Sequence, residues 1–305
     1  MAIGRGGFTR PTSFASLESM PRESITTARR SFSGPAGGAR AEVITSRENR
    51  WIKLFRAALR EGYVCEDGVI GLEGPHLVEE ALRSHCAVEA LLVSPDGETA
   101  LAHWPADWRR SVRELKTTAR LFESVAATEH PQGIAALVRP HEWAFDDLIR
   151  GGIPLVVVLV GVQDPGNVGT AVRSAEAFGA TGLLAAKGTA DPWSAKALRA
   201  SAGSALRLPV VRGIAAAVAM AQLRISGLRI LAASSKQSAA GSSADLREPC
   251  AILVGNEGAG LPAEIEKSAD GIFAIPIAAG VDSLNAGVAA SIILYEAARQ
   301  RAGRG

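Results

Sequence analysis

Three glycine-rich loops hold the residues of this sequence that could bind a small ligand and act on it. They are residues 161–169 (GVQDPGNVG), 255–260 (GNEGAG) and 278–285 (AAGVDSLN). Each follows an apolar, strand-like run, and the first and third lead directly into a helical pattern. Glycine has no side chain to keep a ligand from the backbone, so these loops together predict a small-ligand site.

The first loop combines turn residues with a cation. Asp164-Pro165-Gly166 is a turn, Asn167 is expected to cap a helix at 168–178, and Arg173 follows less than two turns into that helix. Arg173 could therefore meet an anionic ligand at the edge of a sheet. The alternative is a solvated helix charge beside an ordinary strand-to-helix junction. The dinucleotide pattern GxGxxG and the phosphate-binding pattern GxxxxGK[ST] are absent, which argues against a nucleotide-dependent oxidoreductase.

The other two loops each carry a few polar side chains. Glu257 is the single acid among three glycines, and it could serve a ligand or lie near a helix N-terminus. Ser283 or Asn285 can cap a final helix, which is a purely structural role and fits Ser283 better than Asn285.

The elements around these loops alternate between strand-like and helical patterns. Such repeats predict an α/β fold with a mostly parallel sheet and helices on both faces, in which ligands bind beyond the carboxyl ends of the strands. The expected strands are 155–162, 182–186, 208–211, 228–233, 251–254 and 272–277, and the expected helices are 168–178, 195–202, 215–224 and 284–301.

A smaller α/β module is expected ahead of this fold. Residues 1–40 resemble a disordered tail, or less plausibly an organellar transit peptide, and residues 141–152 resemble a linker. The module thus spans 41–140 and the larger domain 153–305. Within the module, 47–61 and 76–84 are expected to be helical, and 69–72, 88–94 and 134–138 to be strands.

Composition narrows the class of protein without deciding the partner. A chain of 305 residues fits two domains, and a net charge of +2 requires any nucleic-acid contact to come from local clusters of Lys and Arg. Three widely spaced cysteines disfavour disulfides and zinc sites, and indicate a reducing cytoplasm. The longest apolar runs are too short to span a membrane.

Together the three loops resemble the motifs of the SpoU (TrmH) family of SPOUT-class RNA methyltransferases. The resemblance extends from 153 to 301 through DPGNVGTAVRSAEAFGA, DPWSAKALRASAGSALRLPV, LVGNEGAGLP and IPIAAGVDSLNAGVAASIILYE. Less strongly, GLEGPHLVEEAL and HPQGIAALV resemble the family's ribosomal-protein-like RNA-binding domain.

The resemblance implies a trefoil-knotted sheet, a homodimer, and S-adenosylmethionine as methyl donor with no metal. The donor is expected to meet backbone groups at Gly255, Ile275 and Leu284, with Ala232 and Ala233 lining the same pocket.

The resemblance also assigns the catalytic residues. Arg173 matches the family's arginine at the target ribose, with Asn167, Glu257, Ser283 and Asn285 around it. A guanidinium stays protonated in proteins, so Arg173 is expected to hold the phosphate and hydroxyl in line with the methyl group and not to act as a base. Asn285 would position the hydroxyl or Arg173, and Glu257 would orient Arg173.

The implied reaction is 2'-O-ribose methylation of RNA, not DNA. Ribosomal RNA is favoured over transfer RNA, and a non-catalytic RNA-binding or ribosome-assembly protein on the same fold is the remaining alternative. Taken individually, each basic residue near the site or in the first module is better explained as a solvated charge, and family position supports only Arg199. The expected RNA contacts are Lys187, Lys196, Arg199, Arg207, Arg47, Arg50 and Lys53.

Overall fold

The computed structural model describes residues 41–61, 68–234, 245–278 and 280–302. The tail predicted at 1–40 and Cys65 lie outside these ranges. Cys86 and Cys250 are buried free thiols. Among the described helices, none is long and apolar enough to cross a membrane.

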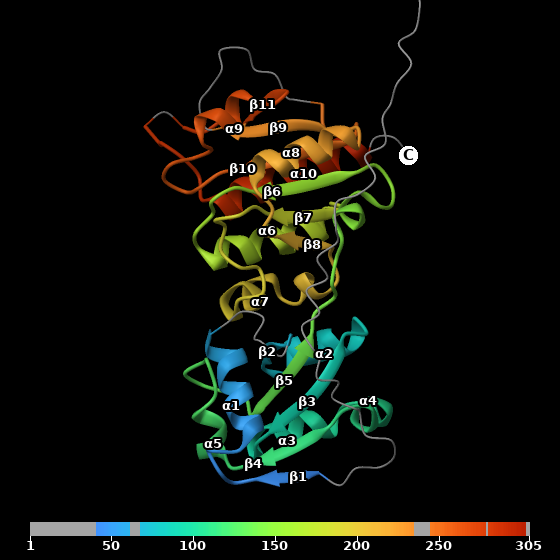
Figure 1. Cartoon of the computed structure of the whole chain (residues 1–305), viewed down its shortest axis with the longest axis vertical. Coiled ribbons are helices and arrows are strands. Elements are labelled where there is room, and N and C mark those ends of the chain that lie inside the picture. The colour runs from blue at the N-terminus through green and yellow to red at the C-terminus, as the bar shows by residue number, and fades with distance from the viewer. Residues whose placement is uncertain (1–40, 62–67, 235–244, 279, 303–305) are drawn as a thin grey trace, which may run out of the picture. The chain divides into compact units, whose positions relative to one another are not determined.

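The first sheet is mixed, and we call its strands and their helices the first module (Figure 1). Its strand order is β1-β4-β3-β5-β2, with β1, β4 and β3 parallel and β5 antiparallel to both β3 and β2. The strands are β1 (Glu42–Ile44), β2 (Ile70–Glu73), β3 (Ala87–Val93), β4 (Glu114–Thr117) and β5 (Ile134–Arg139). The helices are α1 (Arg50–Arg56) with its π-helical continuation η1 (Ala57–Glu61), α2 (Pro75–Arg83), α3 (Pro95–Ala102), α4 (Ala106–Ser111) and α5 (Ala119–Glu123).

Alternation along β3 distributes its side chains between two cores. Ala90 and Leu92 pack in one buried cluster with residues of α1 and α5, whereas Leu91 and Val93 pack in another with residues of α2. Consecutive side chains point to opposite faces of a strand, so both faces of β3 are covered. The sequence predicted α1, α2, β2, β3 and β5 but missed β1, β4 and α3 to α5. These elements are short, so each contains too few apolar repeats to reveal a period.

The second sheet is entirely parallel, and with its helices it forms the second module. Its order is β11-β9-β10-β6-β7-β8. An α/β fold with a mostly parallel sheet and a smaller α/β module ahead of it is thus confirmed. The strands are β6 (Leu155–Leu159), β7 (Gly182–Ala185), β8 (Val210–Arg212), β9 (Arg229–Ser234), β10 (Cys250–Val254) and β11 (Gly271–Ala274). The trefoil knot implied by the family resemblance stays a prediction.

Helices cover both faces of this sheet, so every side chain of β6 is buried. Leu155 and Val157 join a cluster with residues of α6 and α10, while Val156 and Val158 join one with residues of α8 and η2. The helical elements are η2 (Phe145–Ile149), α6 (Pro165–Ala177), α7 (Ala195–Ser201), η3 (Ser204–Leu206), α8 (Ala216–Ile225), α9 (Ala263–Lys267) and α10 (Ala286–Ala302). The segment expected to be a linker contains η2, whose Leu148 is fully buried.

Two neighbouring strands bring the first two loops together. Strands β6 and β10 pair in parallel, so the loops that follow them leave the sheet at the same edge. Asn256 fixes this proximity, since its Nδ2 donates to the carbonyl of Gly161 at 2.9 Å.

Candidate active site

Helix α6 begins three residues earlier than expected, and this changes the role of Asn167. The N-cap is Asp164, whose Oδ1 accepts from the backbone N–H of Gly166 at 3.1 Å, and Pro165 occupies the first helical position. Proline is common at that position because a backbone N–H there would have no partner within the helix, and proline has no N–H to leave unpaired. The prediction of Asn167 as the cap was wrong, and its side chain is free for contacts elsewhere.

Asn285, and not Ser283, caps helix α10. Its Oδ1 accepts from the backbone N–H of Val288 at 3.1 Å. Its Nδ2 donates to Oδ1 of Asn167 at 2.8 Å, so the third loop is joined to the first turn of α6. Ser283 is exposed and faces a cavity described below.

Glu257 completes a chain of hydrogen bonds through all three loops. Asn167 Nδ2 donates to its Oε1 at 2.7 Å, and Asn256 Nδ2 donates to its Oε2 at 3.3 Å. The donors and acceptors of this hydrogen-bond chain can be assigned in only one way. The backbone donor at Val288 requires the oxygen of Asn285, and the carboxylate requires the N–H of Asn167.

The surroundings of Glu257 keep it ionised. Burial by itself would raise the pKa of this carboxyl group, but the hydrogen bond from Asn167 and those from the backbone N–H groups of Gln163 and Asp164 outweigh it, and the pKa is lowered from its usual 4.5. At neutral pH the second loop therefore presents a fixed negative charge at the sheet edge.

A cavity of about 280 Å³ opens beside this chain of hydrogen bonds. Four of the five residues predicted to bind the methyl donor line it, namely Ala233, Gly255, Ile275 and Leu284. Ala232 does not, because it is fully buried in β9 and consecutive strand residues face opposite ways.

The loop formed by residues 255–260, which lines the cavity, requires glycine at position 255. A Cβ on Gly255 would lie 2.3 Å from the backbone carbon of Gly260, so only glycine lets the two ends of the loop close. Asn256 and Gly260 exchange backbone hydrogen bonds of 3.0 and 2.9 Å across this closure. The loop is thus closed by its own backbone and lines one side of the cavity.

The lining of the cavity suits a ligand that joins an apolar ring to positively charged groups. Val254, Leu261 and Ile277 supply apolar surface. Among the described lining residues, Glu257, Glu266 and Asp282 are acidic and none is Lys or Arg. S-adenosylmethionine combines an adenine ring with sulfonium and ammonium groups, so the residues present fit this cofactor.

The predicted cations lie apart from the hydrogen-bonded chain. Arg173 is exposed on α6 and has no hydrogen-bond or ion-pair partner among the residues that the structure describes. The expectation that Glu257 orients Arg173 is thus not seen, since Glu257 contacts Asn167 and Asn256 instead. Lys196 pairs with Asp164 at 2.5 Å, and Arg199 is exposed on α7. Arg207, which was also expected to contact RNA, pairs instead with Glu176 and Glu80.

Two side chains that the sequence did not single out help to build the site. Asn256 holds the second loop to Gly161, and its Oδ1 accepts from two backbone N–H groups of its own loop. Gln163 donates from Nε2 to the carbonyls of Gly161 and Gly188 at 3.1 and 2.6 Å. Their position in glycine-rich loops was the only available signal.

Comparison with known proteins identifies the family. Residues 154–295 match the SpoU rRNA Methylase family, and residues 53–136 match the MRM3-like substrate binding domain. The 23S rRNA (guanosine(2553)-2'-O)-methyltransferase RlmP of Bacillus subtilis is 32% identical over 83% of this chain and 97% of its own length. This chain belongs to the SpoU family.

Solved structures agree with this assignment. The SpoU methyltransferase AviRb from Streptomyces viridochromogenes, in complex with the cofactor AdoMet (S-adenosylmethionine), superposes with a TM-score of 0.71 at 27% identity, covering 84% of this chain and 99% of AviRb. The AdoMet-bound rRNA methyltransferase from Sinorhizobium meliloti gives 0.70 at 30% identity, covering 85% and 98%. This SpoU protein is an S-adenosylmethionine-dependent RNA methyltransferase, which confirms the expected methyl donor.

Proposed function

We propose that this SpoU protein transfers a methyl group from S-adenosylmethionine to a ribose 2'-hydroxyl of ribosomal RNA. The observation that carries the proposal is the chain Asn285–Asn167–Glu257, which joins the three loops beside an acid-lined cavity. The match to RlmP along nearly its whole length supports the ribose as acceptor and ribosomal RNA as substrate.

In this proposal, the residues that line the cavity bind the methyl donor. Backbone groups at Gly255, Ile275 and Leu284 would bind its adenine and ribose, with Ala233 beside them. The acidic side chains of the lining stabilise its positive charges. When bound, S-adenosylmethionine supplies a methyl group already activated on a sulfonium.

The remaining task is to align the acceptor oxygen. Asn285 holds its amide in one orientation through two hydrogen bonds, which leaves one Nδ2–H to orient a ribose hydroxyl. Arg173 would bind the adjacent phosphate, for which a planar guanidinium is well suited. Alignment of this kind is worth several orders of magnitude in rate.

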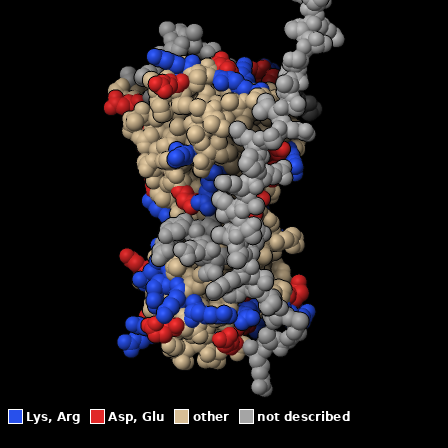
Figure 2. Space-filling model, in the orientation of Figure 1, with Lys and Arg blue, Asp and Glu red and all other residues tan. Residues whose placement is uncertain are grey.

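Basic side chains of the first module would supply the rest of the RNA contact. Lys and Arg gather over this part of the chain, in the lower half of Figure 2. We define the basic stripe as four side chains at or before α1, none of which is buried: Arg47, Arg50, Lys53 and Arg56. Contacts between such residues and phosphates fix the register of an RNA without reading its sequence.

We further propose that two copies pair through helix α10. Val288, Ile292 and Tyr295 are 45%, 38% and 55% exposed and follow one another at helical spacing, which forms an apolar stripe. Tyr295 also packs edge-on against Phe178, next to the end of α6. An Ile292→Glu variant is expected to run as a monomer in light scattering where the wild type is a dimer.

Arg173 gives the decisive test of the activity. Arg173→Ala should bind S-adenosylmethionine and S-adenosylhomocysteine as the wild type does in calorimetry, while NAD binds to neither protein. Methyl transfer to 23S rRNA should be lost, as measured by mass spectrometry of the nucleosides after digestion. Arg247→Ala, an exposed arginine that pairs with Asp245, is the control and should retain transfer.

The same assay separates the alternatives. Methyl groups on transfer RNA alone would replace ribosomal RNA as substrate. Methylated bases in place of 2'-O-methyl nucleosides would overturn the proposed acceptor. A wild-type protein that binds RNA and donor without transfer would be a non-catalytic RNA-binding member of the family.

A further inference from the structure

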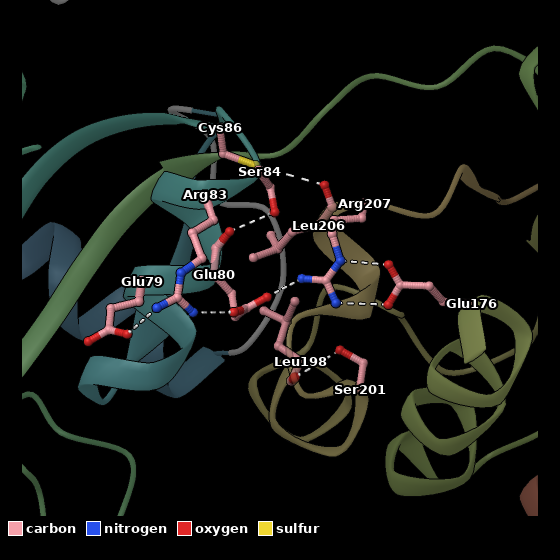
Figure 3. A network of polar contacts seen from close by, with 10 residues as sticks. All are labelled: Glu79, Glu80, Arg83, Ser84, Cys86, Glu176, Leu198, Ser201, Leu206 and Arg207. Atoms are coloured by element: carbon pink, nitrogen blue, oxygen red, sulfur yellow. Dashed lines mark hydrogen bonds and ion pairs between the residues drawn. The ribbon is translucent and has the colours of Figure 1, made fainter.

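Arg207 joins two acidic residues that belong to different modules. Its Nε and Nη2 donate to the two carboxylate oxygens of Glu176 on α6 at 2.6 and 2.8 Å, and its Nη1 donates to Glu80 on α2 (Figure 3). The bidentate contact with Glu176 fixes the relative orientation of the two groups as well as their distance, because the guanidinium and the carboxylate are both planar.

In the first module, Glu80 also forms an ion pair within its own helix. Arg83 donates to Glu80 at 2.8 Å and to Glu79 at 3.0 Å, and Glu79 also accepts from the indole of Trp104 at 2.8 Å. The Glu80 side chain is only 15% exposed. Its carboxylate is therefore held in place by α2 itself.

On the side of the second module, the segment that carries Arg207 is packed tightly against α6. A Cβ on Gly169 of α6 would lie 2.3 Å from the carbonyl oxygen of Ala197 on α7, so these helices meet backbone to backbone. Gly203, between α7 and η3, is also close to the Glu80 side chain, because a Cβ added there would lie 2.9 Å from Cβ of Glu80. Leu206 also accepts a weak contact from the Cys86 thiol at 4.0 Å.

The ion pair between Arg207 and Glu176 keeps both of its groups charged. The hydrogen bond to Glu176 raises the pKa of Arg207. Burial opposes ionisation of Glu176, but the hydrogen bonds from Arg207 and Ser204 outweigh it and lower its pKa. The contact thus persists across the neutral pH range in which the enzyme would act.

Helix α6 is the element that carries Arg173, three residues before Glu176. We infer that Arg207 is a positioning residue, which couples the first module to α6 so that RNA held by that module reaches Arg173 in a productive register. The inference rests on the proposed function, in which the first module binds RNA and Arg173 holds the target phosphate.

The expected size of the effect on stability and on rate distinguishes a positioning role of Arg207 from a stabilising one. Partly exposed ion pairs such as these, with Arg207 36% and Glu176 30% exposed, add little to the stability of a fold. A misplacement of about 1 Å between reacting groups, in contrast, can lower a rate about a hundredfold. Loss of the Arg207 contacts should therefore affect turnover more than folding.

The test compares Arg207→Gln with Arg224→Gln. Both variants replace an arginine that forms a partly exposed ion pair, but Arg224 pairs with Asp270 of its own module, whereas Arg207 also reaches Glu80 of the first module. At saturating 23S rRNA and S-adenosylmethionine, Arg207→Gln should lower the single-turnover methylation rate about tenfold to a hundredfold. Its affinities for RNA and donor and its melting temperature should match those of Arg224→Gln, whose rate should stay at the wild-type value.

A second pair of variants shows whether the effect passes through Glu80. Glu80→Gln should lower the rate in the same way, and the double variant with Arg207→Gln should be no slower than Arg207→Gln alone. An unchanged rate in Arg207→Gln, or a loss that follows reduced RNA affinity or melting temperature, would overturn the inference while the wild type still methylates RNA. A wild type that methylates no RNA would remove the proposed function and the inference with it.

Discussion

The side-chain amide of Asn285 donates a hydrogen bond of 2.8 Å to Oδ1 of Asn167, across 118 residues of chain. This bond ties the start of α10 to the first turn of α6, and Asn167 passes the connection on to Glu257. The three loops of the site are therefore connected to one another by side-chain hydrogen bonds.

Replacing Asn167 should impair methyl transfer more than donor binding. Asn167→Ala removes the link between Asn285 and Glu257, so the amide of Asn285 loses one of its two anchors. We expect the single-turnover rate to fall about a hundredfold, with the affinity for S-adenosylmethionine retained in calorimetry.

Ser174→Ala provides the control for this variant. Ser174 and Ser291 share a hydrogen bond of 2.6 Å that also connects α6 to α10, but neither belongs to the chain through Asn167. This variant should keep its rate. Equal losses in the two variants would mean that general helix contacts, and not the hydrogen bonds of Asn167, set the geometry.

The charge of Glu257 should make stability depend on pH in the acid range. Its pKa is lower in the folded protein than the usual 4.5, so the stabilisation is complete above about pH 4.5 and disappears as the pH falls through the lowered value. Glu257→Gln keeps the shape but not the charge. The difference in unfolding free energy between wild type and variant, from urea titrations, should be largest at pH 7 and shrink toward pH 3. A difference that grows on acidification would contradict this.

Much of the fold could be predicted because its elements repeat over a sufficient length. The run at β6 is apolar at every position, which is typical of a strand buried on both faces, and the structure buries all five of its residues. The three loops were predicted to share an edge because parallel strands end together. Asn167, Glu257 and Asn285 do meet there.

The sequence could not decide between neighbouring residues that suit the same role. It also could not reveal contacts between residues far apart in the chain. Asp164 and Asn167 are both good helix caps, and the proline between them decided in favour of Asp164. Ala232 and Ala233 are identical in type, and only the orientation of β9 places Ala233 at the cavity. The contact of Arg207 with Glu80 spans 127 residues, and no local pattern reports it.

Two glycines on helix α6 should respond differently to the same substitution. At Gly169 an added Cβ would meet backbone atoms of α7, including the Ala197 carbonyl oxygen at 2.3 Å. Because backbone cannot move aside cheaply, Gly169→Ala should lower the unfolding free energy by about 1–3 kcal/mol. At Gly166 the nearest atoms, at 3.1 and 3.3 Å, belong to the flexible side chains of Asp164 and Lys196, and Gly166→Ala should be tolerated. Chemical denaturation measures both, and equal stability of the two variants would refute close packing of α6 on α7.

Salt dependence of RNA binding should reveal whether the basic stripe touches phosphates. Each lost phosphate contact reduces the slope of log affinity against log salt by about 0.7 on single-stranded nucleic acid. The double variant Arg47→Ala with Arg56→Ala should therefore bind 23S rRNA more weakly and with a shallower slope, while its donor affinity is unchanged. Arg109→Ala with Arg110→Ala removes the same charge from α4 and should leave the slope unaltered. If the Arg109/Arg110 variant lowers the slope and the Arg47/Arg56 variant does not, the RNA follows a different face of the first module.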